Sequence, residues 1–469
     1  MKKSTFGVVV GNRGFFPDAL AKDGRESLLA VLKTSGYEAV ALTPAQTKCG
    51  SVETLADALK CAALFAEKAG EIDGIIVTLP NFGDEKGVAE SIKRSGLKVP
   101  VLIHAEPDTV GLMTSARRRD SFCGKISVCN NLNQAGIPYT LTKSHTVGVN
   151  SAEFAQDLAE FAAVCAVVKG LRRNVRFGAV GARTGAFNTV RFSEKILEAS
   201  GIAVETVDLS EILGKVAQLS GDDVAVKEKL DSLKNYVAVG GVPNESLLKM
   251  AKFGLVIDRW TKDLRLDGTA IQCWTSLQEF FGIMPCTLMS MMSESLMPSA
   301  CEVDVMGLLS MYILQLASAA PSAILDWNNN YGDDPNKCVV FHCSNLPKSY
   351  FETSKMDFNE IIGSIMGPAV SYGTVVGKIK AGPATYCRAA TQDTSGGIDV
   401  YVGEGKFVDC DIDSFGGYGV MEIPNMQALM RHICLRGFEH HVAVNLSQKA
   451  AVIREALSNY MGWSVYLHA

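Results

Sequence analysis

The sequence lacks the features that would direct it to a membrane or to a nucleic acid. Its longest apolar stretches, such as residues 306–320, contain Gly and Ser and are too short to span a bilayer. Basic clusters are limited to residues 117–119 and 172–173, and the net charge is -5. A polyanion-binding surface needs a broader basic patch. We therefore expect neither a membrane span nor a nucleic-acid partner.

The glycine motifs that bind nucleotides are also missing. The turn at residues 178–185 is rich in Gly, but it does not have GxGxxG spacing and contains neither GKS nor GKT. A tight turn from strand to helix, in which Gly supplies backbone freedom, explains this segment better. No nucleotide cofactor is predicted.

The sequence contains cysteines, but their spacing forms no paired motif. None of the thirteen cysteines forms a CxxC pair, and Cys61, Cys165 and Cys434 stand in apolar runs, where a thiol behaves as a small hydrophobic side chain. Near the N-terminus, the apolar run at residues 5–10 is stopped by residues 11–14, and no cleavage site follows. That run is predicted to be a buried strand. Reduced thiols and a cytoplasmic location are expected.

The length of 469 residues exceeds what one hydrophobic core usually supports, so two or three domains are expected. Short apolar runs alternate with amphipathic helices in the first two thirds of the chain, which is typical of parallel sheets covered on both faces. We predict two doubly wound, Rossmann-like α/β domains, at residues 1–168 and 169–330. The predicted strands are 6–10, 39–42, 74–79, 99–104, 176–180 and 203–208, and the predicted helices are 25–35, 54–68, 87–95, 151–168, 190–200 and 224–235.

The pattern changes after residue 331 to short strands separated by Gly, Asn, Asp and Ser. Residues 331–469 are therefore predicted to form a mostly β C-terminal domain, a small antiparallel barrel. The predicted strands are 339–343, 372–379, 385–392, 398–402 and 406–410, and the predicted helices are 426–435 and 448–461.

Two carboxylates, Glu302 and Asp304, stand immediately before a long apolar helix. Residues two apart on a formed helix point in nearly opposite directions, so both can address one site only from the entry loop or a frayed first turn. Helix capping and interaction with the helix dipole, worth up to about 1 kcal/mol each, explain these acids equally well. From these residues alone, both interpretations stay open.

Two further segments carry polar groups next to apolar strands. Asp326 ends a short buried run, where a carboxylate is well placed for a site, although an Asx turn is the commoner role of such a residue. His440 and His441 open an apolar strand, and adjacent strand residues face opposite sides, so one imidazole can enter a pocket. Because the chain has only seven histidines, a tandem pair raises the odds of metal ligation.

Together, these segments resemble the L-fucose and L-arabinose isomerase superfamily. The order of these motifs is similar to the L-fucose isomerase pattern: Glu-x-Asp before an apolar helix, then Asp at the end of the next strand, then His-His near the C-terminus. The spacing from Glu302 to Asp326 is similar as well. Other stretches resemble the shorter, fucose isomerase-like branch of the superfamily. These stretches are residues 12–13, 24–27, 122–127, 129–132, 134–138 and 341–345.

The resemblance implies a metal-dependent aldose–ketose isomerase that acts through an enediol on a monosaccharide such as L-fucose or L- or D-arabinose. It implies Glu302, Asp326 and His441 as ligands of Mn²⁺, with Mg²⁺ or Co²⁺ as alternatives. Carboxylates with one imidazole suit Mn²⁺ better than zinc or copper chemistry. Glu302 is expected to move the proton between C1 and C2, with Asp304 or Asp326 as its partner.

The family-like stretches also provide candidates for contacts with the sugar and with a neighbouring subunit. Trp327, next to Asp326 in a polar loop, is favoured for stacking on a sugar face, whereas core packing is favoured for Trp274. The resemblance implies a homo-oligomer, a trimer or hexamer in which a neighbour completes the site, although a surface-loop role is equally well supported for the neighbour's candidates. The sugar-binding candidates are Arg13, Gln272, Trp327, Asn328, His342 and His440, and the neighbouring-subunit candidates are Lys125, Asn130 and His145.

Two other functions stay open. Shorter members of the superfamily are not confined to fucose, so the chain can instead be an isomerase of a modified sugar such as sulfoquinovose. A non-catalytic sugar-binding protein is an alternative of another class, because two α/β domains can form a cleft. The missing signal peptide and the added β domain argue against this second alternative.

Overall fold

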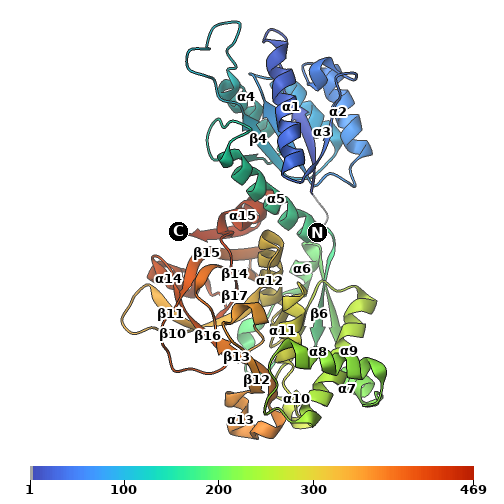
Figure 1. Cartoon of the computed structure of the whole chain (residues 1–469), viewed down its shortest axis with the longest axis vertical. Helices are drawn as coiled ribbons and strands as arrows, with labels where there is room; N and C mark the ends of the chain where they lie inside the picture. Colours follow the sequence, from blue (N-terminus) through green and yellow to red (C-terminus); the bar gives the residue numbers. More distant parts are fainter. Residues whose placement is uncertain (1–3) are drawn as a thin grey trace. The chain divides into compact units, whose positions relative to one another are not determined.

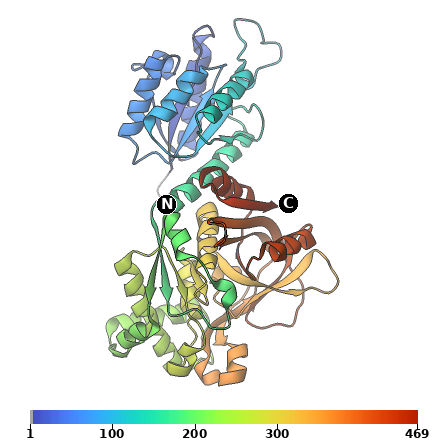
Figure 2. The same ribbon diagram turned by 180° about the vertical axis from the view of Figure 1, so that it is seen from behind.

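The computed structural model describes residues 4–469 and divides into two compact units. Unit 1 comprises the chain up to Lys169 together with Glu455–Gly462, and unit 2 comprises Gly170–Arg454 and Trp463–Ala469. Figures 1 and 2 show the ribbon from opposite sides. Within residues 4–469, no helix combines the length and the apolar character that a membrane span requires.

Unit 1 is a doubly wound α/β fold, as predicted, with a parallel sheet in the order β2-β1-β3-β4-β5. Helices α1 and α5 pack on one face of the sheet, and α2, α3 and α4 pack on the other. The strands are β1 (Thr5–Val10), β2 (Glu38–Ala41), β3 (Gly74–Leu79), β4 (Val101–Ala105) and β5 (Thr140–Leu141). The helices are α1 (Asp18–Thr34), the short η1 (Lys48–Gly50), α2 (Leu55–Glu67), α3 (Glu85–Ser95), α4 (Ser121–Gln134) and α5 (Ala152–Arg172).

Helix α1 is longer than the helix predicted at residues 25–35, because it begins at Asp18. The additional turns bury Ala21 and Gly24. Such small residues contribute little to a hydrophobic pattern, so this half of the helix has a weak sequence signal.

Unit 2 begins with a second parallel sheet, in the order β7-β6-β8-β9. The chain leaves β6, β8 and β9 at Gly181, Gln272 and Glu302, and open parallel sheets bind ligands beyond these carboxyl ends. The strands are β6 (Val175–Val180), β7 (Ile202–Val207), β8 (Gly268–Ile271) and β9 (Ser299–Cys301). The helices are η2 (Asn188–Val190), α6 (Glu194–Ala199), α7 (Leu209–Ala217), α8 (Val224–Tyr236), α9 (Asn244–Leu264), α10 (Ser276–Phe280), α11 (Cys286–Glu294) and α12 (Val305–Ser318).

A mostly β sheet completes unit 2, in the order β12-β13-β16-β11-β10-β17-β14-β15-β18. An additional pairing between β16 and β15 closes part of it into a ring, and every pair in the ring is antiparallel. The predicted fold class, two α/β parts and a small antiparallel barrel, is therefore confirmed. The strands are β10 (Ala323–Asn330), β11 (Lys337–His342), β12 (Lys355–Phe358), β13 (Tyr372–Lys378), β14 (Gly382–Thr391), β15 (Ile398–Val408), β16 (Gly417–Glu422), β17 (His441–Asn445) and β18 (Ser464–His468). The helices are η3 (Lys348–Tyr350), α13 (Glu360–Met366), η4 (Pro368–Val370), α14 (Met426–Arg436) and α15 (Ala450–Arg454). The π-helix that follows, η5 (Glu455–Tyr460), belongs to unit 1.

The parallel sheet and the ring share one unit because helix α12 lies against both. It contacts β8 and β9 as well as β14 and β17. Figure 1 shows α12 beside β14 and β17, and Figure 2 shows it as the yellow helix beside the ring. The domain boundaries predicted at residues 168 and 330 stay predictions.

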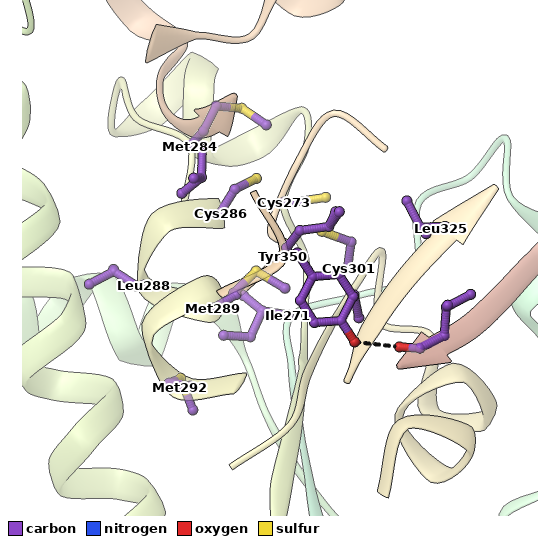
Figure 3. Packing of buried hydrophobic residues seen from close by; sticks show 14 of the residues in the cluster. Ile271, Cys273, Met284, Cys286, Leu288, Met289, Met292, Cys301, Leu325 and Tyr350 are labelled. Atoms are coloured by element: carbon purple, nitrogen blue, oxygen red, sulfur yellow. Dashed lines mark hydrogen bonds between the residues drawn. The ribbon is translucent and has the colours of Figure 1, made fainter. Parts of the chain in front are cut away.

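The core of unit 2 joins the ends of strands from both sheets. Figure 3 shows Ile271, Cys273 and Cys301 gathered with Tyr350 and Leu325. Tyr350 donates its hydroxyl to the carbonyl of Val444 (2.8 Å), so its polar end is satisfied in the core. This packing holds the carboxyl ends of β8 and β9 against β10.

We predict that Leu325→Ala lowers the free energy of unfolding by about 2–5 kcal/mol, because it leaves a cavity at a fully buried position of β10. Chemical denaturation measures this change. The matched control is Leu435→Ala, at a side chain that is 72% exposed and is expected to cost no more than about 0.5 kcal/mol. Equal losses for the two variants would contradict the proposed core.

Candidate metal centre

The register of the ring brings together side chains that lie far apart in the sequence. Strands β10 and β17 pair antiparallel, with Asp326 opposite His441. Residues directly opposite each other in such a pair project to the same face, so the register alone puts this carboxylate beside this imidazole. His342 ends β11, the neighbour of β10 on its other side, and Glu302 directly follows β9.

Glu302 stands in an unusual backbone turn. Glu302 and Val303 both have left-handed backbone conformations, with φ of 56° and 58°. This conformation costs roughly 1–3 kcal/mol for a residue other than Gly, and it is rare for a β-branched side chain such as Val. Such strain persists only where the surrounding packing imposes it, and it is commonly found at functional sites.

Glu302, His342 and His441 form a buried cluster. The Oε2 atom of Glu302 lies 3.1 Å from Nε2 of His441 and 3.6 Å from Nε2 of His342, yet it has no hydrogen-bond partner. Its other oxygen, Oε1, accepts hydrogen bonds from the indole of Trp274 (3.0 Å) and the thiol of Cys273 (3.8 Å). Burial raises the pKa of Cys273 to about 12, which keeps this thiol protonated.

Asp326, His440 and His441 form a second group that overlaps the first. The Oδ1 atom of Asp326 lies 3.4 Å from Nε2 of His441 and 3.6 Å from Nε2 of His440, and this buried oxygen also lacks a hydrogen-bond partner. The side chains of Asp326 and His440 remain 23% and 41% exposed, whereas that of His441 is 1% exposed. Asp326 and His440 therefore form the accessible side of the cluster.

Asp304 contacts His441 through Nδ1, the ring nitrogen that does not face Glu302. Its Oδ2 atom lies 2.8 Å from Nδ1 of His441, and its carboxylate accepts two hydrogen bonds from Arg388 (2.5 and 3.0 Å). Arg388 is fully buried and also donates to Glu439 (3.0 Å). The backbone N–H of Gly307 donates to Asp304 as well (2.8 Å), so Asp304 both caps α12 and belongs to the site.

Charge pairing governs the protonation of these buried groups. Burial favours the neutral form of Glu302, but His342 and His441 outweigh it and hold its pKa well below the usual range. Burial also favours the neutral form of Asp304, but Arg388 and His441 outweigh it and lower the pKa of Asp304. Burial lowers the pKa of His441, but Asp304 and Glu302 together raise it to about 10. His441 is therefore an imidazolium at neutral pH when no metal is bound.

The donor set fits a divalent cation. Two buried carboxylate oxygens without hydrogen-bond partners, Oε2 of Glu302 and Oδ1 of Asp326, flank Nε2 of His441. A buried carboxylate oxygen without a hydrogen bond is costly, and a cation would satisfy both of these oxygens. A histidine that binds a metal usually bonds a carboxylate, a backbone carbonyl or water through its other ring nitrogen, and Asp304 occupies this position at Nδ1 of His441.

Several predicted sugar-binding residues lie at or near this cluster. The structure places His342 and His440 among the candidate metal ligands. Gln272, at the end of β8, accepts a hydrogen bond from the backbone N–H of Ala182 (2.9 Å). Gly181 has a left-handed backbone with φ of 82°, and a Cβ there would lie 2.4 Å from Oε1 of Gln272, so this close approach requires Gly.

The surroundings of Trp327 and Trp274 differ from those expected from the sequence. Trp327 follows Asp326 on β10 and packs on the opposite side of the strand, where its indole donates to Tyr401 (2.9 Å). Trp274, for which core packing is favoured, is half-buried and donates to Glu302. Asn328 is exposed on β10.

Arg13 belongs to unit 1, where it follows the carboxyl end of β1. It forms an ion pair with Glu85, donates to the carbonyl of Gly83 (2.8 Å), and its guanidinium lies 4.0 Å from the ring centre of Phe82. These contacts hold Arg13 within its own unit, and its contact with a sugar stays a prediction.

The three neighbouring-subunit candidates also belong to unit 1. Lys125 is buried and donates to the hydroxyl of Thr142 (2.6 Å), His145 packs edge-on against Phe122, and Asn130 is exposed. Their contribution to a neighbour's site, and the trimer or hexamer that it requires, stay predictions.

Two residues of the site are not found by the sequence analysis. Arg388 is a charged residue inside the apolar run of β14, and a charge in such a run is a signal for a buried pair. Phe187 lies in the loop after β6, and its ring centre is 5.5 Å from that of His440 and 5.9 Å from that of His441. Nothing in the local sequence around Phe187 indicates this position.

Family models of sugar isomerases match both ends of the chain. The model described as "Fucose/sulfoquinovose isomerase, N-terminal domain" matches residues 7–172, and the model described as "L-fucose isomerase, C-terminal domain" matches residues 340–468. Together they cover well over half of the chain. The chain therefore belongs to the fucose/sulfoquinovose isomerase family of aldose–ketose isomerases, as the resemblance predicted.

Curated relatives extend the match through the middle of the chain. Sulfoquinovose isomerases of Priestia aryabhattai and Priestia megaterium are each 24% identical over 387 residues, which cover 80% of this chain and 81% of theirs. A sulfoquinovose isomerase of Alkalicoccus urumqiensis is 24% identical over 388 residues, which cover 82% of this chain and 83% of its own.

We predict that Asp304→Asn raises the dissociation constant for Mn²⁺ by about 10- to 100-fold, because the neutral amide no longer orients His441 as the carboxylate does. Titration calorimetry measures this affinity. The matched control is Asp258→Asn, which removes a carboxylate paired with Lys229. If Asp304→Asn bound Mn²⁺ as tightly as the control variant, Asp304 would not orient a ligand of the metal centre.

Metal binding should also release protons. With its pKa near 10, His441 carries a proton at pH 7 that must leave before Nε2 can bind a cation, so affinity should rise with pH until His441 is neutral. Calorimetry in two buffers with different ionisation enthalpies counts the protons, and we expect about one or more per Mn²⁺ at pH 7. Binding of Mn²⁺ without proton release would contradict ligation by His441.

Proposed function

We propose that the protein is a Mn²⁺-dependent aldose–ketose isomerase that acts on the sulfonated sugar sulfoquinovose. The isomerase part rests on one observation: His441, held by Asp304, presents Nε2 to the unpartnered oxygens of Glu302 and Asp326. The relatives called sulfoquinovose isomerase favour the sulfonated sugar over L-fucose or arabinose.

The chemistry sets the requirements of such a site. Interconversion of an aldose and a ketose moves a proton between C1 and C2 through an enediol, so it needs a base and stabilisation of negative oxygen. A divalent cation bound by Glu302 and His441, together with His342 or Asp326, would polarise the oxygens on C1 and C2. Mg²⁺ prefers oxygen ligands, so the presence of imidazoles favours Mn²⁺ or Co²⁺ over Mg²⁺.

We assign proton transfer, sugar binding and the positioning of His441 to different residues around it. Glu302 and Asp326 are the carboxylates with unpartnered oxygens, and of these two Asp326 is the more exposed, so we assign it the transfer of the proton. His440, 3.6 Å from Asp326 and also exposed, can bond a sugar hydroxyl. Both oxygens of Asp304 are engaged by protein donors, so we assign it the positioning of His441.

The test is a sugar panel assayed with Mn²⁺. We expect ketose formation from sulfoquinovose, and a lower kcat/KM for L-fucose, L-arabinose and D-arabinose. His441→Ala should lose both bound Mn²⁺ and turnover. The matched control His432→Ala, at a histidine of α14 that stacks on Tyr466, should keep both.

Three outcomes would contradict the proposal in different ways. Turnover by His441→Ala would remove the metal centre from the reaction. Preference for L-fucose or an arabinose would replace the sulfonated substrate by a neutral one. Sugar binding without any interconversion would identify a sugar-binding protein.

A further inference from the structure

A polar cavity of about 660 Å³ lies in unit 2 at the carboxyl end of β6. Its walls come from the loop after β6, from Val303, from the end of β14 and from the segment that joins α14 to β17. Three arginines line it: Arg183, Arg191 and Arg436. The candidate metal ligands do not line this cavity.

Two of these arginines have unpaired charges. Arg436 forms an ion pair with Asp399 (2.6 Å), but within residues 4–469 neither Arg183 nor Arg191 has a carboxylate within ion-pair distance. Arg183 donates to the backbone carbonyl of Thr184 (3.1 Å), and Arg191 donates to that of Asn188 (2.9 Å). Backbone carbonyls position the guanidinium groups without neutralising them.

The acidic residues of the cavity do not cancel this charge. Glu439 already pairs with the buried Arg388 (3.0 Å), which leaves Asp393 against the two free guanidinium groups. The cavity thus has an excess of positive charge. Guanidinium groups bind oxyanions well because their N–H groups match the spacing of sulfonate, phosphate or carboxylate oxygens.

The cavity borders the metal centre. Val303 follows Glu302, and Glu439 precedes His440, so two walls of the cavity continue directly into the candidate ligands. The loop after β6 contributes to both places, because Phe187 packs on His440 while Arg183 and Arg191 line the cavity. A substrate with its reacting carbons at the metal centre can therefore extend toward these arginines.

We propose that this cavity is the subsite for the anionic group of the substrate, a sulfonate or phosphate on the carbon farthest from C1, with Arg183 and Arg191 as its binding residues. The proposal rests on the proposed function for the position of C1 and C2. It explains how an acidic sugar is selected: a neutral sugar leaves both guanidinium groups without an anion, whereas sulfoquinovose has its sulfonate on C6, at the opposite end from the reacting carbons.

The test compares Arg183→Gln, Arg191→Gln and the double variant with wild type, all loaded with Mn²⁺. We expect the double variant to raise KM for sulfoquinovose by about 10- to 100-fold, since it removes hydrogen bonds between charged groups, which are stronger than neutral ones. Its kcat should change little, and its Mn²⁺ content should match wild type. The matched control is Arg431→Gln, an exposed arginine of α14 outside the cavity lining.

Glucose 6-phosphate separates the two anion sources. A lower KM for sulfoquinovose than for glucose 6-phosphate supports a sulfonate subsite, and the reverse order supports a phosphate subsite, provided that the double variant loses the preference. An unchanged KM for both acidic sugars in the double variant would overturn the proposal.

Calorimetric binding of sulfoquinovose distinguishes this proposal from the proposed function. If wild type binds sulfoquinovose without converting it and the double variant binds it more weakly, the isomerase assignment fails and the anion subsite stands. Equal binding by wild type and the double variant overturns the subsite, whatever the turnover.

Discussion

The buried carboxylate of Asp304 is the contact on which the candidate site depends. It caps α12, pairs with Arg388 of β14 and fixes the ring of His441 at the start of β17, so one side chain connects three elements. A fully buried charge is tolerated only when it is paired and hydrogen-bonded, and removal of one partner typically costs about 3–5 kcal/mol. The direction in which Nε2 of His441 faces is therefore a consequence of this network.

The site needs both halves of unit 2. The parallel sheet contributes Glu302 at the carboxyl end of β9, and the ring contributes Asp326, His342 and His441 from three adjacent strands. Helix α12 and the shared core hold these halves together, so the strained turn at Glu302 is supported from both sides. The same edge of the parallel sheet carries the loop with Arg183, which joins the metal centre to a positively charged cavity.

The fold class was predictable because its signals are local. Continuous apolar strands such as β1 and β3, and the short strands after residue 331, each show their type within a few residues. The candidate ligands Asp326 and His441 required the family resemblance, because their proximity comes from pairing between distant strands. The same limit explains why Arg388 was missed. Trp327 was favoured for its polar neighbours, and its contact with a sugar stays a prediction. Strand alternation places its indole on the side of β10 where it donates to Tyr401.

The most direct test of the metal centre is anomalous scattering from crystals of the wild-type protein grown with Mn²⁺. The account predicts a peak within bonding distance of Nε2 of His441, with oxygens of Glu302 or Asp326 as further ligands and Nδ1 of His441 still bonded to Asp304. A peak elsewhere in unit 2, with Nε2 of His441 bonded only to protein atoms, would contradict it.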